Sequence, residues 1–286
     1  MTIPDFFVIG AFKSGTTALN YMLTQHDRIF VHRIVKETNF FAPDAHLGFR
    51  IEARTEYEDL FRSASAAQRI GEVCPSYLFS KVAAGLIRRD APDARLVAVL
   101  RDPADRAFSD FMMQVRNGRR RIEDLRPQIE REIQRQPLPG DRPILAQGLY
   151  AGQLSRFWSL FPRSSIKVML HSDLKNHALD TVNDLFDFIG LEPLSRIKSD
   201  QIYNVSGIPR STVLQHVINR ARRKRMVVKR IVPERLHGPA MRLANRNLRK
   251  AQLSPELRSL LVSYYRADIL TLQNEIDHDL SAWLRC

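Results

Sequence analysis

The stretch that decides the fold is DFFVIGAFKSGTTALNYML, residues 5–23. Its first six residues form a short apolar run ending in glycine, which is typical of a buried strand in a parallel sheet. A loop between Gly10 and Gly15 follows, and residues 15–25 then carry apolar side chains at helical spacing. A strand, a glycine-bounded loop and a helix amino terminus together favour anion binding, because main-chain N–H groups and the helix dipole attract negative charge.

The loop has the G-x-x-x-x-G-x-T spacing of a P-loop, with one departure. The lysine that should follow the second glycine is replaced by Thr16, and the lysine of this loop is Lys13. An ordinary tight turn between a strand and a helix is the alternative interpretation. The residues predicted to hold a phosphate are Lys13, Ser14, Gly15, Thr16 and Thr17.

The rest of the chain alternates between strand and helix patterns. We predict strands at 69–73, 95–100 and 166–170. We predict helices at 80–89, 103–115, 122–136, 147–161, 178–189 and 255–276. This alternation is typical of a parallel sheet covered on both faces by helices. We therefore predict an α/β fold, a P-loop-like three-layer arrangement with a central parallel sheet, in which residues 1–286 form a single domain.

Charge is concentrated in one part of the sequence. The chain of 286 residues carries a net charge of +13, and residues 211–250 hold twelve Lys and Arg residues against one acid, Glu234. This basic segment could contact an anionic surface or a carrier, although charge runs are more often solvated helix faces. A hydrophobic content of 44% with 26% charged residues excludes global disorder.

Cysteine content and hydropathy bear on the compartment. Two cysteines, Cys74 and Cys286, are too few for a disulfide scaffold and favour a reducing compartment. No apolar run approaches the roughly 20 residues that span a bilayer, and the first residues lack a secretory signal pattern. We expect no transmembrane segment and a cytoplasmic protein, with peripheral attachment to a membrane as an alternative.

Two motifs resemble the nucleotide site of sulfotransferases that use 3′-phosphoadenosine-5′-phosphosulfate (PAPS). Residues 6–19, FFVIGAFKSGTTAL, resemble the loop that binds the 5′-phosphosulfate. The strand at 95–100 is followed by R-D-P-x-x-R-x-x-S, which resembles the 3′-phosphate site and implies that Arg101 and Ser109 bind that phosphate. Taken alone, a salt-bridged arginine and an ordinary helix serine would explain these two residues.

Three further segments extend the resemblance. K-E-T-N-F-F at 36–41 is similar to a segment of the branch that contains heparan-sulfate sulfotransferases and bacterial relatives, which implies that Glu37 is the catalytic base. His32 is a competing base. E-V-C-P-S-Y at 72–77 resembles the E-K-T-P-x-Y segment, but Val73 stands where the family has a lysine. The segment 203–211 resembles the late loop over the nucleotide, where Arg210 is a 3′-phosphate candidate or part of a surface turn.

The resemblance implies a reaction without a required metal, in which PAPS donates a sulfuryl group to a hydroxyl or amine. The acceptor is a small molecule, natural product, glycan or lipid, and the sequence does not choose among them. A P-loop kinase or NTPase, with Asp102 as its Mg²⁺ ligand, is one alternative. A nucleic-acid-binding protein built on 211–250 is another, although that stretch lacks a recognition motif and we do not expect nucleic acid as a partner. The departure at Val73 also leaves open a fold without activity.

Overall fold

The structure, a computed structural model, describes residues 3–32, 35–45, 49–135, 143–199, 207–211, 214–215, 218–220, 247–249 and 251–286. The chain divides into two compact units. The sheet unit comprises Met1–Asp102, Leu149–Tyr203 and Arg266–Leu284, and the helical unit comprises Pro103–Gly148, Asn204–Tyr265 and Arg285–Cys286. That residues 1–286 act as a single domain stays a prediction.

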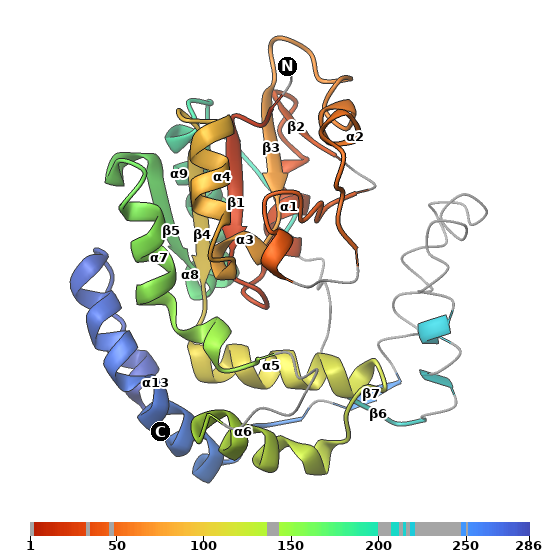
Figure 1. The fold of residues 1–286 in the computed structure, drawn as a ribbon, viewed down its shortest axis with the longest axis vertical. Coiled ribbons are helices and arrows are strands. Elements are labelled where there is room, and N and C mark those ends of the chain that lie inside the picture. The colour runs from red at the N-terminus through yellow and green to blue at the C-terminus, as the bar shows by residue number, and fades with distance from the viewer. Residues whose placement is uncertain are drawn as a thin grey trace. The chain divides into compact units, whose positions relative to one another are not determined.

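A five-stranded parallel sheet with the order β2-β3-β1-β4-β5 lies at the centre of the sheet unit (Figure 1). Its strands are β1 (Phe6–Gly10), β2 (Ile29–Val31), β3 (Arg69–Val73), β4 (Arg95–Leu100) and β5 (Ile166–Leu170). β1 lies between β3 and β4, with Phe6 opposite Gly71 on one side and Arg95 on the other. All its residues are buried, which explains the continuous apolar run in the sequence.

Helices cover both faces of this sheet. One core cluster joins Phe6 and Val8 to α1 (Thr16–Leu23), α8 (His171–Asn176) and α9 (Ala178–Phe188). Phe7, which points the other way along the pleat, packs its ring against Tyr77 of α3 (Ser76–Phe79). α4 (Ala83–Asp90) and α7 (Tyr150–Trp158) pack against α3. The predicted three-layer α/β fold is confirmed.

Sequence periodicity located the strands well and the helix boundaries less well. The strands at 69–73, 95–100 and 166–170 occupy the predicted residues. The helix predicted at 147–161 begins instead at Tyr150, because the carboxylate of Asp268, far along the chain, accepts the N–H groups of Tyr150 and Ala151. The short elements β2, α2 (Arg54–Asp59), α3 and α8 were not predicted, since so few residues show no clear periodicity.

The helical unit contains α5 (Pro103–Arg116), α6 (Leu125–Ile133) and a two-stranded antiparallel sheet of β6 (Ile208–Pro209) and β7 (Leu248–Arg249). Single helical turns stand at Ile122–Asp124 and Ala146–Gly148 in this unit, and at Pro43–Ala45, Arg163–Ser165 and Ser281–Leu284 in the sheet unit. The long helix α13 (Pro255–Glu275) contributes residues to both units. None of the described helices is both long enough and apolar enough to span a bilayer.

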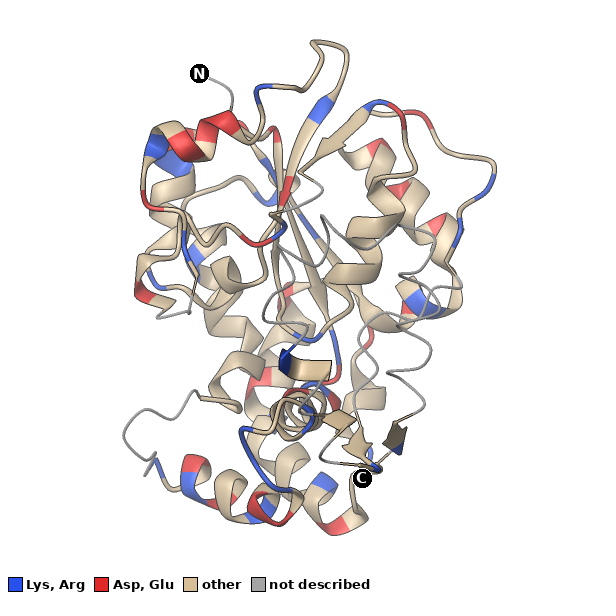
Figure 2. Ribbon diagram, turned by 90° about the vertical axis from the view of Figure 1, so that its right-hand side faces the viewer, with Lys and Arg blue, Asp and Glu red and all other residues tan. Residues whose placement is uncertain are grey.

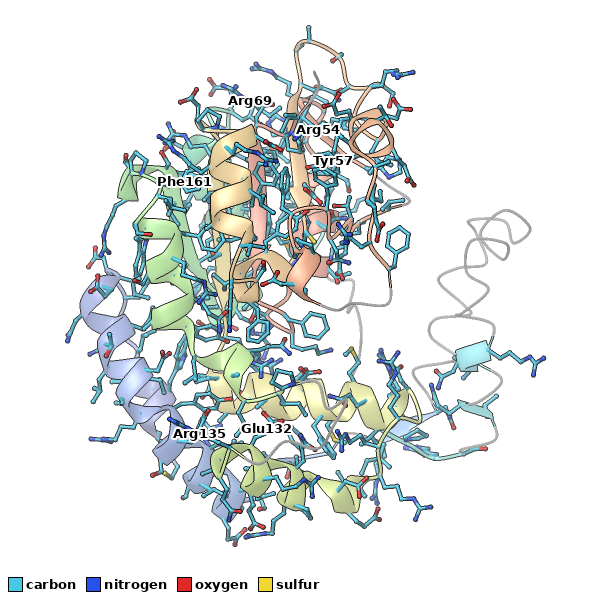
Figure 3. The ribbon with its side chains drawn as sticks, viewed as in Figure 1. Arg54, Tyr57, Arg69, Glu132, Arg135 and Phe161 are labelled. Carbon is cyan, nitrogen blue, oxygen red and sulfur yellow. The ribbon has the colours of Figure 1, made fainter. Side chains whose placement is uncertain are left out.

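Buried polar contacts hold the helical unit together. Arg106 of α5, which is fully buried, donates to the carbonyl of Ile144, and its Nη1 lies 3.5 Å from a carboxylate oxygen of Asp110. Glu132 of α6 accepts the N–H groups of Ile144 at 2.9 Å and Leu145 at 2.7 Å (Figure 3). Arg106 belongs to the R-D-P-x-x-R-x-x-S motif, so one arginine of that motif helps to hold this loop.

Acidic and basic residues are interspersed along the described helices and loops (Figure 2). Most of the basic segment 211–250 lies outside the described residues. The prediction that this segment contacts an anionic surface or a carrier therefore stays a prediction.

Candidate active site

The phosphate loop lies at the carboxyl end of β1, and two glycines shape it. Gly15 has φ +90°, and a Cβ added there would lie 2.9 Å from Cδ2 of His171. A Cβ at Gly10 would lie 2.5 Å from Cβ of Leu78. Because neither position has room for a larger side chain, the two glycines of the motif are required by the backbone path and by close packing.

The amino terminus of α1 is open toward the loop. No described side chain caps this helix, which starts after Gly15, and its first turn contains no acidic residue. A helix amino terminus without a side-chain cap or an acidic residue suits phosphate, because its N–H groups and the helix dipole favour negative charge. Thr16 is buried and Thr17 is half-buried beside it. These residues fit a phosphate group of the donor.

Lys13 and Ser14 occupy the turn before this helix. Lys13 is half-buried and has φ +68°. Ser14 is fully buried, its hydroxyl has no hydrogen-bond partner among the described residues, and its N–H donates to the carbonyl of Ala11 at 3.3 Å. The predicted role of Ser14 in phosphate binding stays a prediction, and the structure exposes none of its hydroxyl.

Arg101 follows β4, the strand next to β1, and lies beside the loop. Its Nη1 donates to the carbonyl of Lys13 at 3.4 Å, and its own carbonyl accepts the hydroxyl of Tyr150 at 2.9 Å. The structure thus brings Arg101 to the phosphate loop. Ser109 lies on α5 and the exposed Arg210 follows β6, both in the helical unit, so their contacts with a 3′-phosphate stay predictions.

Glu37 is joined to the phosphate loop through its neighbour Lys36. The Nζ of Lys36 donates to Oε1 of Glu37 at 3.0 Å and to Oγ1 of Thr17 at 3.2 Å. The Lys36 side chain is 21% exposed and that of Glu37 is 39% exposed. An accessible carboxylate therefore lies one ammonium group away from the helix terminus, where it can accept a proton from a bound nucleophile.

The residues after Glu37 are fixed by packing and hydrogen bonds. Asn39 has φ +54°, and its side-chain oxygen Oδ1 accepts a hydrogen bond from the hydroxyl of Ser76 at 2.7 Å. The ring of Phe40 stacks on Tyr57, with 4.2 Å between the ring centroids. The segment that carries Glu37 is thus held against α2 and α3, while the Glu37 side chain itself reaches solvent.

Thr38 is held by a buried carboxyl group that sequence reasoning did not single out. Glu72 of β3 accepts hydrogen bonds from the hydroxyls of Thr38, Tyr57 and Tyr77, the last two at 2.7 Å. Burial raises the pKa of Glu72 to about 7, although the three hydroxyls favour the ionised form. Figure 3 shows Tyr57 on α2. The only sequence signal for this group was its place in the E-V-C-P-S-Y segment.

Residues 3–207 match the family model described as "Sulfotransferase domain". The chain belongs to the sulfotransferase family. This match favours the sulfotransferase interpretation over the kinase, NTPase and nucleic-acid-binding alternatives that the sequence left open.

Named relatives and a solved structure agree with this assignment. The chain is 27% identical over 207 residues to the mouse heparan sulfate glucosamine 3-O-sulfotransferase 3B1, covering 72% of this chain and 51% of that protein. It is 26% identical over 205 residues to the human bifunctional heparan sulfate N-deacetylase/N-sulfotransferase 2, covering 67% of this chain and 22% of that protein. The chain thus spans about half or less of these relatives. A sulfotransferase structure from Alicyclobacillus acidocaldarius matches along the full length of both chains, with a TM-score of 0.73 and 26% identity.

Two other reactive side chains of this sulfotransferase are engaged within the protein. Nδ1 of His32, the competing base, accepts the N–H of Val35 at 2.9 Å, and burial lowers the pKa of its imidazole. Cys74 is buried, its thiol lies 3.3 Å from Oδ1 of Asn39, and burial raises the pKa of the thiol. The contacts of Cys74 are consistent with a structural role, and the choice between Glu37 and His32 as the base stays a prediction.

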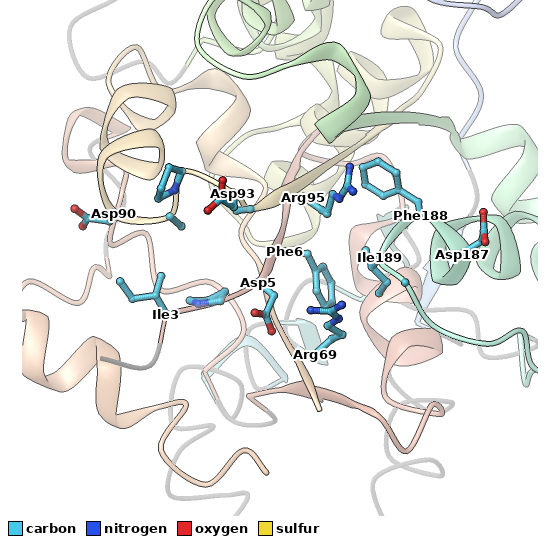
Figure 4. A pocket seen from close by; sticks show the side chains of 15 residues that line it. Ile3, Asp5, Phe6, Arg69, Asp90, Asp93, Arg95, Asp187, Phe188 and Ile189 are labelled. Atoms are coloured by element: carbon cyan, nitrogen blue, oxygen red, sulfur yellow. The ribbon is translucent and has the colours of Figure 1, made fainter. Parts of the chain in front are cut away.

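A cavity of about 540 Å³ lies at the opposite edge of the sheet, at the amino ends of β1, β3 and β4 (Figure 4). Two of its charged side chains bind nearby main-chain groups. Asp5 accepts the N–H of Ile70 at 2.7 Å, and Arg95 donates to the carbonyl of Ser164 at 2.9 Å. Because the phosphate loop lies at the carboxyl ends, this cavity is not part of the candidate site. Within the described part of the chain, no cluster of three or more His, Cys, Asp or Glu side chains could hold a metal ion.

Proposed function

We propose that this sulfotransferase moves a sulfuryl group from PAPS to a hydroxyl or amine, with Glu37 as the general base. One observation carries the proposal. The Lys36 ammonium contacts both the Glu37 carboxylate, at 3.0 Å, and the hydroxyl of Thr17 in the phosphate loop, at 3.2 Å. A base and a phosphate site at this separation suit transfer from a phosphate to a nucleophile.

The donor would be held by residues of the loop and the neighbouring strand. Lys13 and the main-chain N–H groups of Gly15, Thr16 and Thr17 would bind the 5′-phosphate, where the helix dipole also favours negative charge. Arg101, which donates to the Lys13 carbonyl, would bind the 3′-phosphate. By the family resemblance, Ser109 and Arg210 add contacts to the same phosphate.

The chemical step is an in-line displacement at sulfur. The acceptor oxygen or nitrogen forms a bond to sulfur, and Glu37 takes the proton that the acceptor loses. The bond between sulfur and the 5′-phosphate oxygen breaks, and its electron pair leaves with adenosine 3′,5′-bisphosphate. Lys13 and the amides at the start of α1 stabilise the negative charge that grows on that phosphate, each contributing about 2 to 4 kcal/mol.

Both oxygen and nitrogen acceptors are consistent with the relatives. The mouse relative is named as a 3-O-sulfotransferase and the human relative as an N-sulfotransferase. We propose a glycan, lipid or natural product as the acceptor. The run 119–121, with its three arginines, and the basic segment 211–250 would bind an anionic part of it or of a carrier.

Calorimetric titration with adenosine 3′,5′-bisphosphate, compared with ATP and Mg²⁺, tests the donor site. The wild type should bind the bisphosphate without Mg²⁺, and Lys13→Ala or Arg101→Ala should weaken binding about 10- to 100-fold, as expected for loss of a charged hydrogen bond. Lys167→Ala is the control, because Lys167 pairs with Asp184 near the amino end of β5. A preference for Mg²⁺-ATP would refute the proposal.

A further inference from the structure

We infer that Lys36 contacts the oxygens of the sulfuryl group during transfer and supplies the positive charge that position 73 lacks. The inference rests on the proposed function and assigns a role to a residue outside the phosphate loop. Its basis is the position of one ammonium group. Nζ of Lys36 donates to Thr17 at 3.2 Å and to Glu37 at 3.0 Å.

These two partners lie on the leaving-group side and on the nucleophile side of the proposed reaction. Thr17 lies in the first turn of α1, on the side of the departing phosphate, and Glu37 accepts the proton of the attacking nucleophile. In an in-line displacement the sulfuryl group passes between leaving and attacking atoms. An ammonium that touches both sides therefore lies beside the path of the transferred group, where positive charge stabilises its oxygens.

The last residue of the neighbouring strand β3 provides no positive charge at this place. Val73, the last residue of β3, is 2% exposed and belongs to the apolar core cluster. Val73 and Lys36 line the same cavity of about 10 Å³, together with Thr38 and Glu72. Position 73 is where the family resemblance expects a lysine. A cation reaching this region from residue 36 would replace that lysine from a different segment of the chain.

A surface ion pair is the competing explanation for the Lys36 contacts. Exposed pairs of this kind contribute little to folding stability, and their lysines remain mostly in solvent. The Lys36 side chain is 21% exposed, and it also donates to a hydroxyl of the phosphate loop nineteen residues earlier. Hydrogen bonds fix the following residues, Thr38 and Asn39, so the segment holds Lys36 in place.

Binding of donor and product separates the two explanations, because only PAPS carries the sulfuryl group. We would titrate wild type, Lys36→Met and Lys36→Arg with PAPS and with adenosine 3′,5′-bisphosphate. Lys36→Met should weaken PAPS binding at least tenfold and bisphosphate binding less than threefold, and Lys36→Arg should recover most of the loss. Lys167→Met is the matched control, since Lys167 is 20% exposed and ion-paired at 2.7 Å with Asp184. It should change neither affinity.

Thermal unfolding of each variant separates altered binding from altered folding. If Lys36→Met does not fold, Lys36→Arg and Lys36→Gln provide the same comparison. If Lys36→Met loses equal affinity for both nucleotides, or none for either, the inferred role of Lys36 is wrong. The proposed function still stands in that case, provided that the wild type binds the bisphosphate. A wild type that binds neither nucleotide overturns the proposed function, and the inference about Lys36 with it.

Discussion

Replacing Glu72 by glutamine should remove a pH dependence from the folding stability of this sulfotransferase. The Glu72 carboxyl is 3% exposed and accepts hydroxyl hydrogen bonds from Thr38, Tyr57 and Tyr77. Glutamine has nearly the same shape, and its amide oxygen can still accept two of these bonds. The substitution therefore removes the titration of residue 72 while keeping most of its contacts.

The direction of the effect follows from the raised pKa. Burial raises the pKa of Glu72 from 4.5 to about 7 in the folded protein. Between these pH values the folded state keeps a proton that the unfolded state releases, so stability falls as pH rises. The contribution is fully present below pH 4.5 and is lost as pH rises through about 7. At 1.36 kcal/mol per pKa unit, the full loss is about 3 kcal/mol.

Urea denaturation at a series of pH values between 4.5 and 8 measures this loss. The free energy of unfolding of the wild type should fall relative to that of Glu72→Gln by about 3 kcal/mol across the series. The control is Glu52→Gln, because the Glu52 side chain is 76% exposed and pairs with Arg50 at the surface. Its curve should stay parallel to that of the wild type. Parallel curves for wild type and Glu72→Gln would refute the reasoning.

Three further changes test other parts of the structure. Gly15→Ala should cost about 1 to 3 kcal/mol of unfolding free energy, since φ is +90° and the new Cβ would meet His171; a loss below 0.5 kcal/mol by urea denaturation would contradict this. Asp268→Ala should cost about 1 to 2 kcal/mol, because α7 loses the acceptor of its first N–H groups, and an unchanged denaturation midpoint would contradict it. Glu37→Gln should lower sulfate transfer from labelled PAPS about 100-fold or more with bisphosphate affinity within threefold, whereas retained transfer would exclude Glu37 as the base.

The strands β1, β4 and β5 were predictable because they are nearly continuous apolar runs. β4 and β5 occupy the residues that the sequence indicated. The start of α7 was not predictable, because it is set by Asp268, which lies more than a hundred residues away. Elements as short as β2 or α3 gain their structure from tertiary packing, and so few residues cannot establish a period.

Part of the candidate site was likewise predictable from the sequence, and part depends on tertiary structure. The loop between Gly10 and Gly15 was visible in the sequence, because glycine spacing, strand and helix are all local features. The sequence showed Lys36 only as a member of a motif, because its contact with Thr17 depends on the folded path of the chain. The burial of Ser14 is likewise a tertiary property. A residue can therefore stand within the phosphate-loop motif and still have a side chain that solvent does not reach.

As the proposed base, Glu37 must reach its substrate and still be held in place, and the K-E-T-N-F-F segment meets both needs. Thr38 binds a buried carboxyl, and Phe40 stacks on a buried tyrosine. These contacts fix the backbone on one side of Glu37, and the ammonium of Lys36 fixes its carboxylate on the other. Little conformational entropy then remains to be lost when the acceptor binds. The aromatic and hydroxyl residues that look like ordinary core packing are therefore what positions the base beside the phosphate loop.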